Sequence, residues 1–400
     1  MFNKTIENLT FEDIEWLVQN GVTEDQSFEY KRETWGGTDA NKKEMLKDIV
    51  SMANRYGGYI IIGVEEDGEA GKASGINHIP DAENERDRIL SSLLANTQPR
   101  LQSVKIRVLT NNEINVMAIS IPNSFKKPHM ITFTGINQFW VRHDRQKMLM
   151  SIDEIKEAVI NTVNITKDVN LFIAERKQNI IEEVNNEPFM VIGSYPVLSE
   201  KEMIDVTDSQ LREYIKHSPI IRERGVNFSF TYSQPRPSFY GLSIGGGDDF
   251  RKIELHRNGY LEGRVLLSNY LEHKTAILSN QNPPENEAPV IRNWAVVEYL
   301  FSFTKQLKQI YSYYGYDGQI FIFCSLYNIK DFGLREFKES SYYGGSHDLS
   351  RWPKDRLEID TLVFTEVDDV KIAKTFGDRI WQSFGFEKEP YFENGIFTLV

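Results

Sequence analysis

The strongest constraint on the fold is a predicted helix that ends at a glycine pair and continues at once as an apolar strand. Residues 42–55 carry apolar side chains at helical spacing. Gly57 and Gly58 follow, and glycine accepts the positive φ that the end of a helix requires. Residues 59–64 are apolar on both faces, which predicts a central strand of a sheet. Three acidic residues, 65–67, come directly after this strand.

Two polar residues of the predicted helix have an expected structural role. Asp48 lies inside the helix and Asn54 near its end. Short polar side chains of this kind form hydrogen bonds with nearby backbone. We therefore expect both residues to stabilise the helix end and the turn.

An upstream segment combines carboxylates with a lysine in the pattern E-x4-E-x-K, formed by Glu24, Glu29 and Lys31. Residues 28–32 are predicted to form a strand, so Glu29 and Lys31 point to the same face. In many metal-dependent nucleases a carboxylate holds a cation while a lysine stabilises charge on the phosphate. Glu24 precedes the strand and Glu65 follows the apolar strand, so both are expected to reach the same cation.

The predicted metal ligands are therefore Glu24, Glu29 and Glu65, with Lys31 as an assisting catalytic residue. Ligands that are all oxygen suit Mg²⁺ or Mn²⁺ rather than zinc. An E-x-K pattern is also typical of an exposed strand face with a weak surface ion pair. Because short motifs often match by chance, that alternative stays open at this point.

A second group of residues is basic and follows the sheet segment. Side chains of this type bind the phosphates of nucleic acids, although an ordinary solvated basic stretch explains them equally well. ATP is a weakly supported cofactor, because the glycine-rich turn has no G-x4-G-K-[ST] motif around it. The candidate nucleic-acid-binding residues are Lys126, Lys127, His129, Arg142 and Arg145.

The order of predicted helices and strands indicates an α+β chain with two domains, because 400 residues exceed the usual size of one domain. Residues 1–160 form a mixed sheet with helices, and 161–190 form a polar helical linker. Residues 191–400 form a second α+β domain for substrate selection, sensing or oligomerisation. Further predicted elements include helices at 151–159 and 166–187, a strand at 227–232, and helices at 290–313 and 370–384.

Composition excludes several classes of protein. Hydrophobic residues make up 40% of the chain and charged residues 26%, as in an ordinary globular protein. No apolar run is long enough to span a membrane, and the N-terminus lacks the features of a signal peptide. The one cysteine, Cys324, is expected to be buried and fits a reducing cytoplasm. A net charge of −12 disfavours a protein that coats nucleic acid but allows a local basic groove.

Taken together, these motifs resemble the Schlafen AlbA_2 domain over roughly residues 20–160. The matching segments are E-x4-E-x-K, K-D-x4-A-N-x2-G-G-Y-I-I-I-G-V, Gly75-Ile76, I-P-N-S, K-P-H, F-W-V-R and M-S-x2-E-I, in the family's order. The resemblance implies cleavage of structured RNA, notably tRNA and rRNA, by three acidic residues and a divalent metal. The third acid of the family is usually Asp directly after G-V. Glu65 stands there in this chain, with Glu66 and Asp67 as alternatives.

The resemblance favours an enzyme, namely a cytoplasmic divalent-metal-dependent endoribonuclease, with stress or phage defence as its cellular setting. Many bacterial members are described only as DNA-binding or ATP-binding, so a non-catalytic regulator on the same fold is the alternative. Vertebrate members pair two such lobes, whereas this chain shows one. That difference predicts a homodimer or higher homo-oligomer, with RNA as the substrate and no membrane partner.

Overall fold

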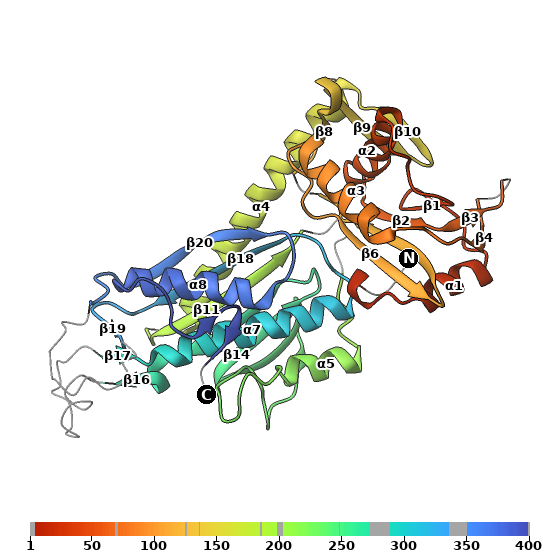
Figure 1. The fold of residues 1–400 in the computed structure, drawn as a ribbon. Helices are drawn as coiled ribbons and strands as arrows, with labels where there is room; N and C mark the ends of the chain where they lie inside the picture. Colours follow the sequence, from red (N-terminus) through yellow and green to blue (C-terminus); the bar gives the residue numbers. More distant parts are fainter. Residues whose placement is uncertain are drawn as a thin grey trace. The chain divides into compact units, whose positions relative to one another are not determined.

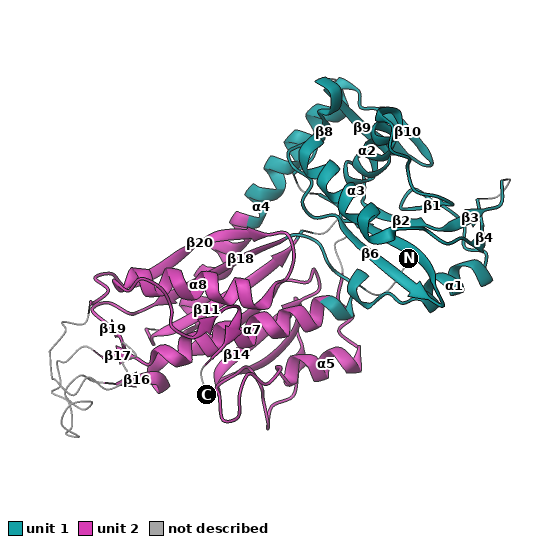
Figure 2. Ribbon diagram, in the orientation of Figure 1, with its two compact units in different colours: residues 1–169, 197–199, 312–319 teal, residues 170–196, 200–311, 320–400 magenta. Residues whose placement is uncertain are grey.

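The computed structural model describes residues 5–68, 71–124, 126–135, 137–184, 186–197, 203–247, 249–272, 289–335 and 350–398. The chain divides into two compact units, coloured separately in Figure 2. Unit 1 comprises residues 1–169, 197–199 and 312–319, and unit 2 comprises the rest. Each unit combines helices with β-sheet, which confirms the α+β class (Figure 1).

Unit 1 contains three helices, three small sheets and the first half of a long fourth helix. The helices are α1 (Phe11–Gln19), α2 (Asp39–Ala53), α3 (Ala82–Asn96) and α4 (Ile152–Val184), with 3-10 turns at Ile6–Asn8 and Phe133–Gly135. The strands are β1 (Phe28–Lys31), β2 (Gly58–Ile62), β3 (Val64–Glu66), β4 (Ala73–Ile76), β5 (Thr97–Gln98), β6 (Lys105–Asn111), β7 (Ile114–Ile121), β8 (Met130–Ile131), β9 (Gln138–His143) and β10 (Gln146–Leu149).

The main sheet of unit 1 has the strand order β1-β2-β7-β6, which confirms β2 as a central strand. β1 runs parallel to β2, and the other neighbours are antiparallel. Ile60 and Ile62 pack on one face with α2 and α3, while Tyr59 and Ile61 pack on the other with α1. β1 is left at the edge of the sheet, so half of its backbone groups have no neighbouring strand.

The glycine pair brings two backbones into close contact. Gly57 has φ +73°, and a Cβ there would lie 2.3 Å from the carbonyl oxygen of Ile121. Gly58 has φ +144°, and its Cβ would lie 2.1 Å from the carbonyl oxygen of Ser27. The two glycines are therefore a packing requirement of the turn between α2 and β2.

The predicted strand 59–64 is interrupted in the structure. Gly63 has φ +96°, which separates β2 from β3. β3 then pairs with β4 in a sheet of its own, with Val64 opposite Ile76. The short strand β3 therefore carries Glu65 and Glu66, and Asp67 follows it.

Unit 2 is built on a seven-stranded antiparallel sheet of order β12-β13-β14-β15-β11-β18-β20. Its strands are β11 (Phe189–Pro196), β12 (Arg236–Pro237), β13 (Gly241–Gly246), β14 (Asp249–His256), β15 (Leu261–Leu266), β18 (Ile320–Tyr327) and β20 (Arg356–Phe364). In addition to the C-terminal part of α4, unit 2 contains the helices α5 (Ser209–Lys216), α7 (Asn293–Tyr313) and α8 (Asp369–Ser383) and a 3-10 turn at Leu267–Tyr270. Smaller pairings join β16 (Leu271–Glu272), β17 (Val290–Ile291), β19 (Gly333–Leu334), β21 (Phe392–Glu393) and β22 (Ile396–Phe397).

Two predictions about secondary structure were wrong, one for a strand and one for a pair of helices. Residues 227–232 form no strand, because their backbone donors are used elsewhere: Phe228 N donates to Ser302 Oγ at 3.0 Å. The two helices predicted at 151–159 and 166–187 form the single helix α4, and the boundary between the units falls inside it.

Cys324 in β18 is buried, as expected from its apolar surroundings in the sequence, and burial raises the pKa of its thiol to about 12.

Within the described ranges, no helix combines the length and apolarity that crossing a membrane requires.

Candidate functional site

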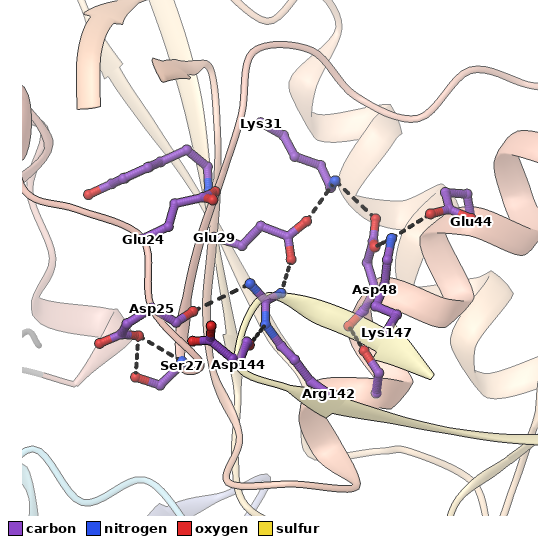
Figure 3. Close-up of polar contacts among 12 residues, drawn as sticks. Glu24, Asp25, Ser27, Glu29, Lys31, Glu44, Asp48, Arg142, Asp144 and Lys147 are labelled. Atoms are coloured by element: carbon purple, nitrogen blue, oxygen red, sulfur yellow. Dashed lines mark hydrogen bonds and ion pairs between the residues drawn. The ribbon is translucent and has the colours of Figure 1, made fainter. Parts of the chain in front are cut away.

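The two faces of β1 separate apolar from charged side chains, as the alternation in its sequence predicts. Phe28 and Tyr30 are buried in the core that contains α1. Glu29 points the other way, where its Oε1 lies 2.8 Å from Lys31 Nζ and its Oε2 pairs with Arg142 of β9 (Figure 3). Burial opposes ionisation of Glu29, but Lys31 and Arg142 outweigh it and lower the pKa of this carboxyl. Glu29 is therefore an ionised carboxylate with a cation on each oxygen.

Asp48 of α2 lies at the centre of the same charge network. It is fully buried, and its Oδ2 accepts a hydrogen bond from Trp35 Nε1 at 2.7 Å and lies 3.0 Å from Lys31 Nζ. Lys147 of β10 pairs with its Oδ1 and with Glu44. Asp48 thus holds two lysines from different strands instead of stabilising the helix end as expected (Figure 3).

Asn54, at the C-terminal end of α2, joins this helix to the sheet that contains β8 and β9. Its Nδ2 donates to the backbone oxygens of His129 and Trp140 at 2.9 and 2.8 Å, and its Oδ1 accepts from His129 N at 2.7 Å. The residue therefore ties the end of α2 to β9 and to the segment before β8.

Glu24 uses the free edge of β1. Its Oε1 accepts a hydrogen bond from Tyr30 N at 2.7 Å, a donor that faces away from β2. Burial, together with the nearby carboxylates of Glu66 and Glu29, raises the pKa of Glu24 to about 7, against the lowering effect of the hydrogen bond from Tyr30. A side-chain hydrogen bond with Glu66 adds to this effect. Glu66 is therefore a neighbour of Glu24, and the negative charge of Glu29 also acts on the Glu24 carboxyl.

β3 directs Glu65 and Glu66 to different partners because consecutive strand residues point to opposite faces. Glu65 Oε1 lies 3.2 Å from Arg32 Nε, and its side chain lies over Gly75. Glu66 is the one that meets Glu24. Of the predicted acids, Glu24 neighbours Glu66, one of the two alternatives to Glu65, whereas Glu29 is paired with Lys31 and Arg142 and Glu65 with Arg32.

The donor set fits a divalent cation at the Glu24–Glu66 pair. Mg²⁺ is often held by only one or two carboxylates together with water and substrate phosphates. Adjoining carboxylates repel each other when both are ionised, and a cation relieves that repulsion. Within the ranges described above, no group of three or more His, Cys, Asp or Glu side chains is arranged to hold a metal. Glu29 and Glu65 are already paired with cationic side chains, so they fit less well as ligands.

The five basic candidates do not form one surface. His129 is buried, with Nδ1 2.7 Å from the backbone oxygen of Pro99 and Nε2 2.7 Å from Ser124 Oγ. Arg142 is also buried against Glu29. Neither side chain is therefore available to a phosphate in this conformation.

The other three basic candidates lie in two places. Arg145 is exposed, and its Nη2 donates to the backbone oxygen of Glu24 at 3.0 Å, beside the acidic pair. Lys126 is exposed and Lys127 partly buried in the loop before β8. Only Arg145 thus combines exposure with a position at the acidic site.

Residues 24–151 match the family model described as "Schlafen, AlbA_2". Among solved structures, the chain is similar to the DIP2311 protein from Corynebacterium diphtheriae, with 13% identity over 37% of this chain and 27% of that one, at a TM-score of 0.26. It is also similar to the N-terminal domain of a RecG-related protein from Nitrosomonas europaea, with 14% identity over 34% of this chain and 88% of that one, at a TM-score of 0.27. The match to the first structure thus spans about a quarter of that protein's length. Among curated proteins, none matches the sequence.

Proposed function

The chain carries a Schlafen AlbA_2 domain over residues 24–151, and from this premise we propose that it is a metal-dependent endoribonuclease acting on structured RNA, tRNA or rRNA. The observation that carries the proposal is the electrostatic coupling of Glu24 to the carboxylates of Glu66 and Glu29, which raise the pKa of Glu24. Such a cluster stores electrostatic repulsion that a bound divalent cation removes. The substrate class comes from the family resemblance.

In this proposal Glu24 and Glu66 hold Mg²⁺ or Mn²⁺. A cation there would supply charge stabilisation for the phosphate and acidify a bound water. Lys31 is held between Glu29 and Asp48 at 2.8 and 3.0 Å. Burial lowers the pKa of Lys31, but the two carboxylates outweigh it and raise the pKa, which keeps the ammonium charged. The role of Lys31 is therefore to neutralise and orient Glu29, while Arg145 is positioned to contact the RNA backbone.

A second candidate function is non-catalytic binding of nucleic acid or a nucleotide on the same domain. The observation that favours it is the full pairing of Glu29, whose two oxygens contact Lys31 and Arg142. Because Lys31 and Arg142 neutralise Glu29, Glu24 and Glu66 are the two carboxylates of this site that remain to bind a cation. Binding of ATP has less support, because Gly57 and Gly58 pack against the backbone of Ile121 and Ser27 and do not line a space for phosphates.

Adjacent glutamates allow a sharp test of the nuclease proposal. Total tRNA is incubated with Mn²⁺ and the wild type, Glu24→Gln, Glu66→Gln or Glu65→Gln. We expect Glu24→Gln and Glu66→Gln to lower cleavage by about 100-fold or more, because each removes a group that stabilises the charged transition state. Glu65→Gln is the matched control and should cleave like the wild type. Calorimetric titration with Mn²⁺ provides a readout independent of cleavage.

Each other outcome is informative. Equal cleavage by wild type and Glu66→Gln would sink the proposed ligand set. Loss of cleavage in Glu65→Gln alone would return the third ligand to that position. If the wild type binds tRNA without cutting it, the binding function is favoured over the nuclease.

A further inference from the structure

Unit 1 contains a cavity of about 600 Å³ that shares no lining residue with the acidic site. The turn after α2, the loop between β7 and β8, and one face of α4 enclose it. Its volume lies in the range of pockets that bind small molecules. Its lining includes Arg55, Tyr56, Asn123 and Lys127, and α4 contributes the three carboxylates of Glu154, Glu157 and Asp168.

Two cationic side chains, Arg55 and Lys127, line the cavity. Lys127 Nζ donates to the backbone oxygen of Arg55 at 2.6 Å. Within the described part of the chain, neither Arg55 nor Lys127 forms an ion pair. Burial lowers the pKa of Lys127 to about 8, and the positive charge of Arg55 contributes. Two neighbouring cations in a partly desolvated place are stabilised by an anion that binds both.

Two buried polar atoms of this cavity lack partners among the described residues. They are Arg55 Nε, a donor, and Asn123 Oδ1, an acceptor. Buried polar groups in folded proteins nearly always have hydrogen-bond partners, and these two exceptions belong to side chains that line the cavity. The centroid of the Tyr56 ring lies 4.8 Å from the Arg55 guanidinium carbon, so this half-exposed ring packs against the guanidinium beside the cavity.

The α4 wall has the opposite character. Glu157 and Asp168 line it together with the polar side chains of Asn161 and Thr162. These groups accept hydrogen bonds, and their charge repels a polyanion. A strand of RNA, negative along its whole length, would therefore be disfavoured here, whereas a small ligand with one anionic end matches both walls.

We propose that this cavity binds a phosphorylated small molecule, with its phosphate monoester on Arg55 and Lys127 and its hydroxyl or amino groups toward α4. The site is independent of RNA cleavage and goes beyond the proposed function. It would make the domain responsive to a metabolite.

Binding of phosphate probes to the full-length, metal-free protein tests the proposal. Inorganic phosphate, ribose 5-phosphate and AMP are titrated by calorimetry into the wild type, Arg55→Gln, Lys127→Gln and Lys126→Gln. We expect at least one monoester to bind the wild type and Lys126→Gln equally, because the Lys126 side chain does not line the cavity. Affinity should fall about 10-fold or more in Arg55→Gln and Lys127→Gln, as expected for loss of a hydrogen bond to a charged group.

Thermal melts confirm that the variants are folded, and Glu66→Gln should bind the probes like the wild type. The proposal is overturned if no probe binds the wild type, or if both cavity variants bind unchanged. It is also overturned if a short RNA, and no monoester, binds in a manner that depends on Arg55 and Lys127. Since neither Mn²⁺ nor cleavage enters the assay, failure here leaves the nuclease proposal standing, and failure of the nuclease proposal leaves this one standing.

Discussion

Glu65 and Glu66 are adjacent and chemically identical, yet β3 gives them different partners. Glu65 pairs with Arg32 at 3.2 Å, while Glu66 acts on Glu24 and raises the pKa of its carboxyl. The difference follows from strand alternation, because neighbouring residues face opposite sides of a sheet. The position after the G-V motif identifies the acidic residues 65–67 in the sequence. The conformation of β3 then determines that Glu66 is the one beside Glu24.

Asp48 is the residue whose loss should destabilise unit 1 most. Asp48→Asn leaves the Lys31 and Lys147 ammonium groups without their shared buried carboxylate. Removing one partner of a buried ion pair costs about 3–5 kcal/mol when the remaining charge is uncompensated. Lys31 keeps Glu29 and Lys147 keeps Glu44, so the lower end of this range applies. We expect a decrease of that size in the free energy of unfolding, measured by urea denaturation.

Glu44→Gln serves as the control for Asp48→Asn. Glu44 also pairs with Lys147, but its side chain is 45% exposed, so a change below about 1 kcal/mol is expected. Equal destabilisation by both substitutions would show that burial of Asp48 does not set the strength of the network.

At the scale of elements, the turn between α2 and β2 depends on close backbone contact. Gly57→Ala would place a methyl group 2.3 Å from the Ile121 carbonyl oxygen, at a φ of +73°. Substitutions where the native conformation is incompatible destabilise by more than about 1 kcal/mol. We expect Gly57→Ala to lower the melting temperature of unit 1 and to disturb the position of β2.

Gly68→Ala provides the comparison for the turn variant. A Cβ at Gly68 would have no neighbour within 4 Å, and its φ is not in the left-handed region. Its stability should change by no more than about 0.5 kcal/mol. A neutral Gly57→Ala variant would contradict the packing role of the glycine pair.

At the scale of the whole molecule, each unit has its own buried core and its own sheets. Proteins with more than one such unit often depart from two-state unfolding. We expect calorimetry of the full chain to show two transitions. Asp48→Asn should lower the transition of unit 1, and Phe376→Ala, at a fully buried position of α8, should lower that of unit 2 by about 3–5 kcal/mol. A single transition that moves in both variants would show that the units unfold together.

Local patterns were sufficient for most helices and for the central strand of unit 1. α2, α7 and α8 were predicted close to their observed bounds, because each has apolar residues at helical spacing, and β2 was recognised as a central strand because both of its faces are apolar. The pattern failed at 227–232, where Phe228 and Phe230 are buried in a loop. Burial of a side chain does not by itself reveal how the backbone is hydrogen-bonded.

The sequence by itself determined the element types, the charged face of β1 and the match to the AlbA_2 motifs, because these depend on residues a few positions apart. Only the tertiary structure decided that Arg142 pairs with Glu29 across 113 positions and that Lys127 reaches Arg55 across 72. It also decided that Glu66, and not Glu65, joins Glu24. Contacts of this kind depend on strand order, register and the paths of loops. Local periodicity carries no information on those quantities, so the residues of the motif are evident in the sequence while their partners are not.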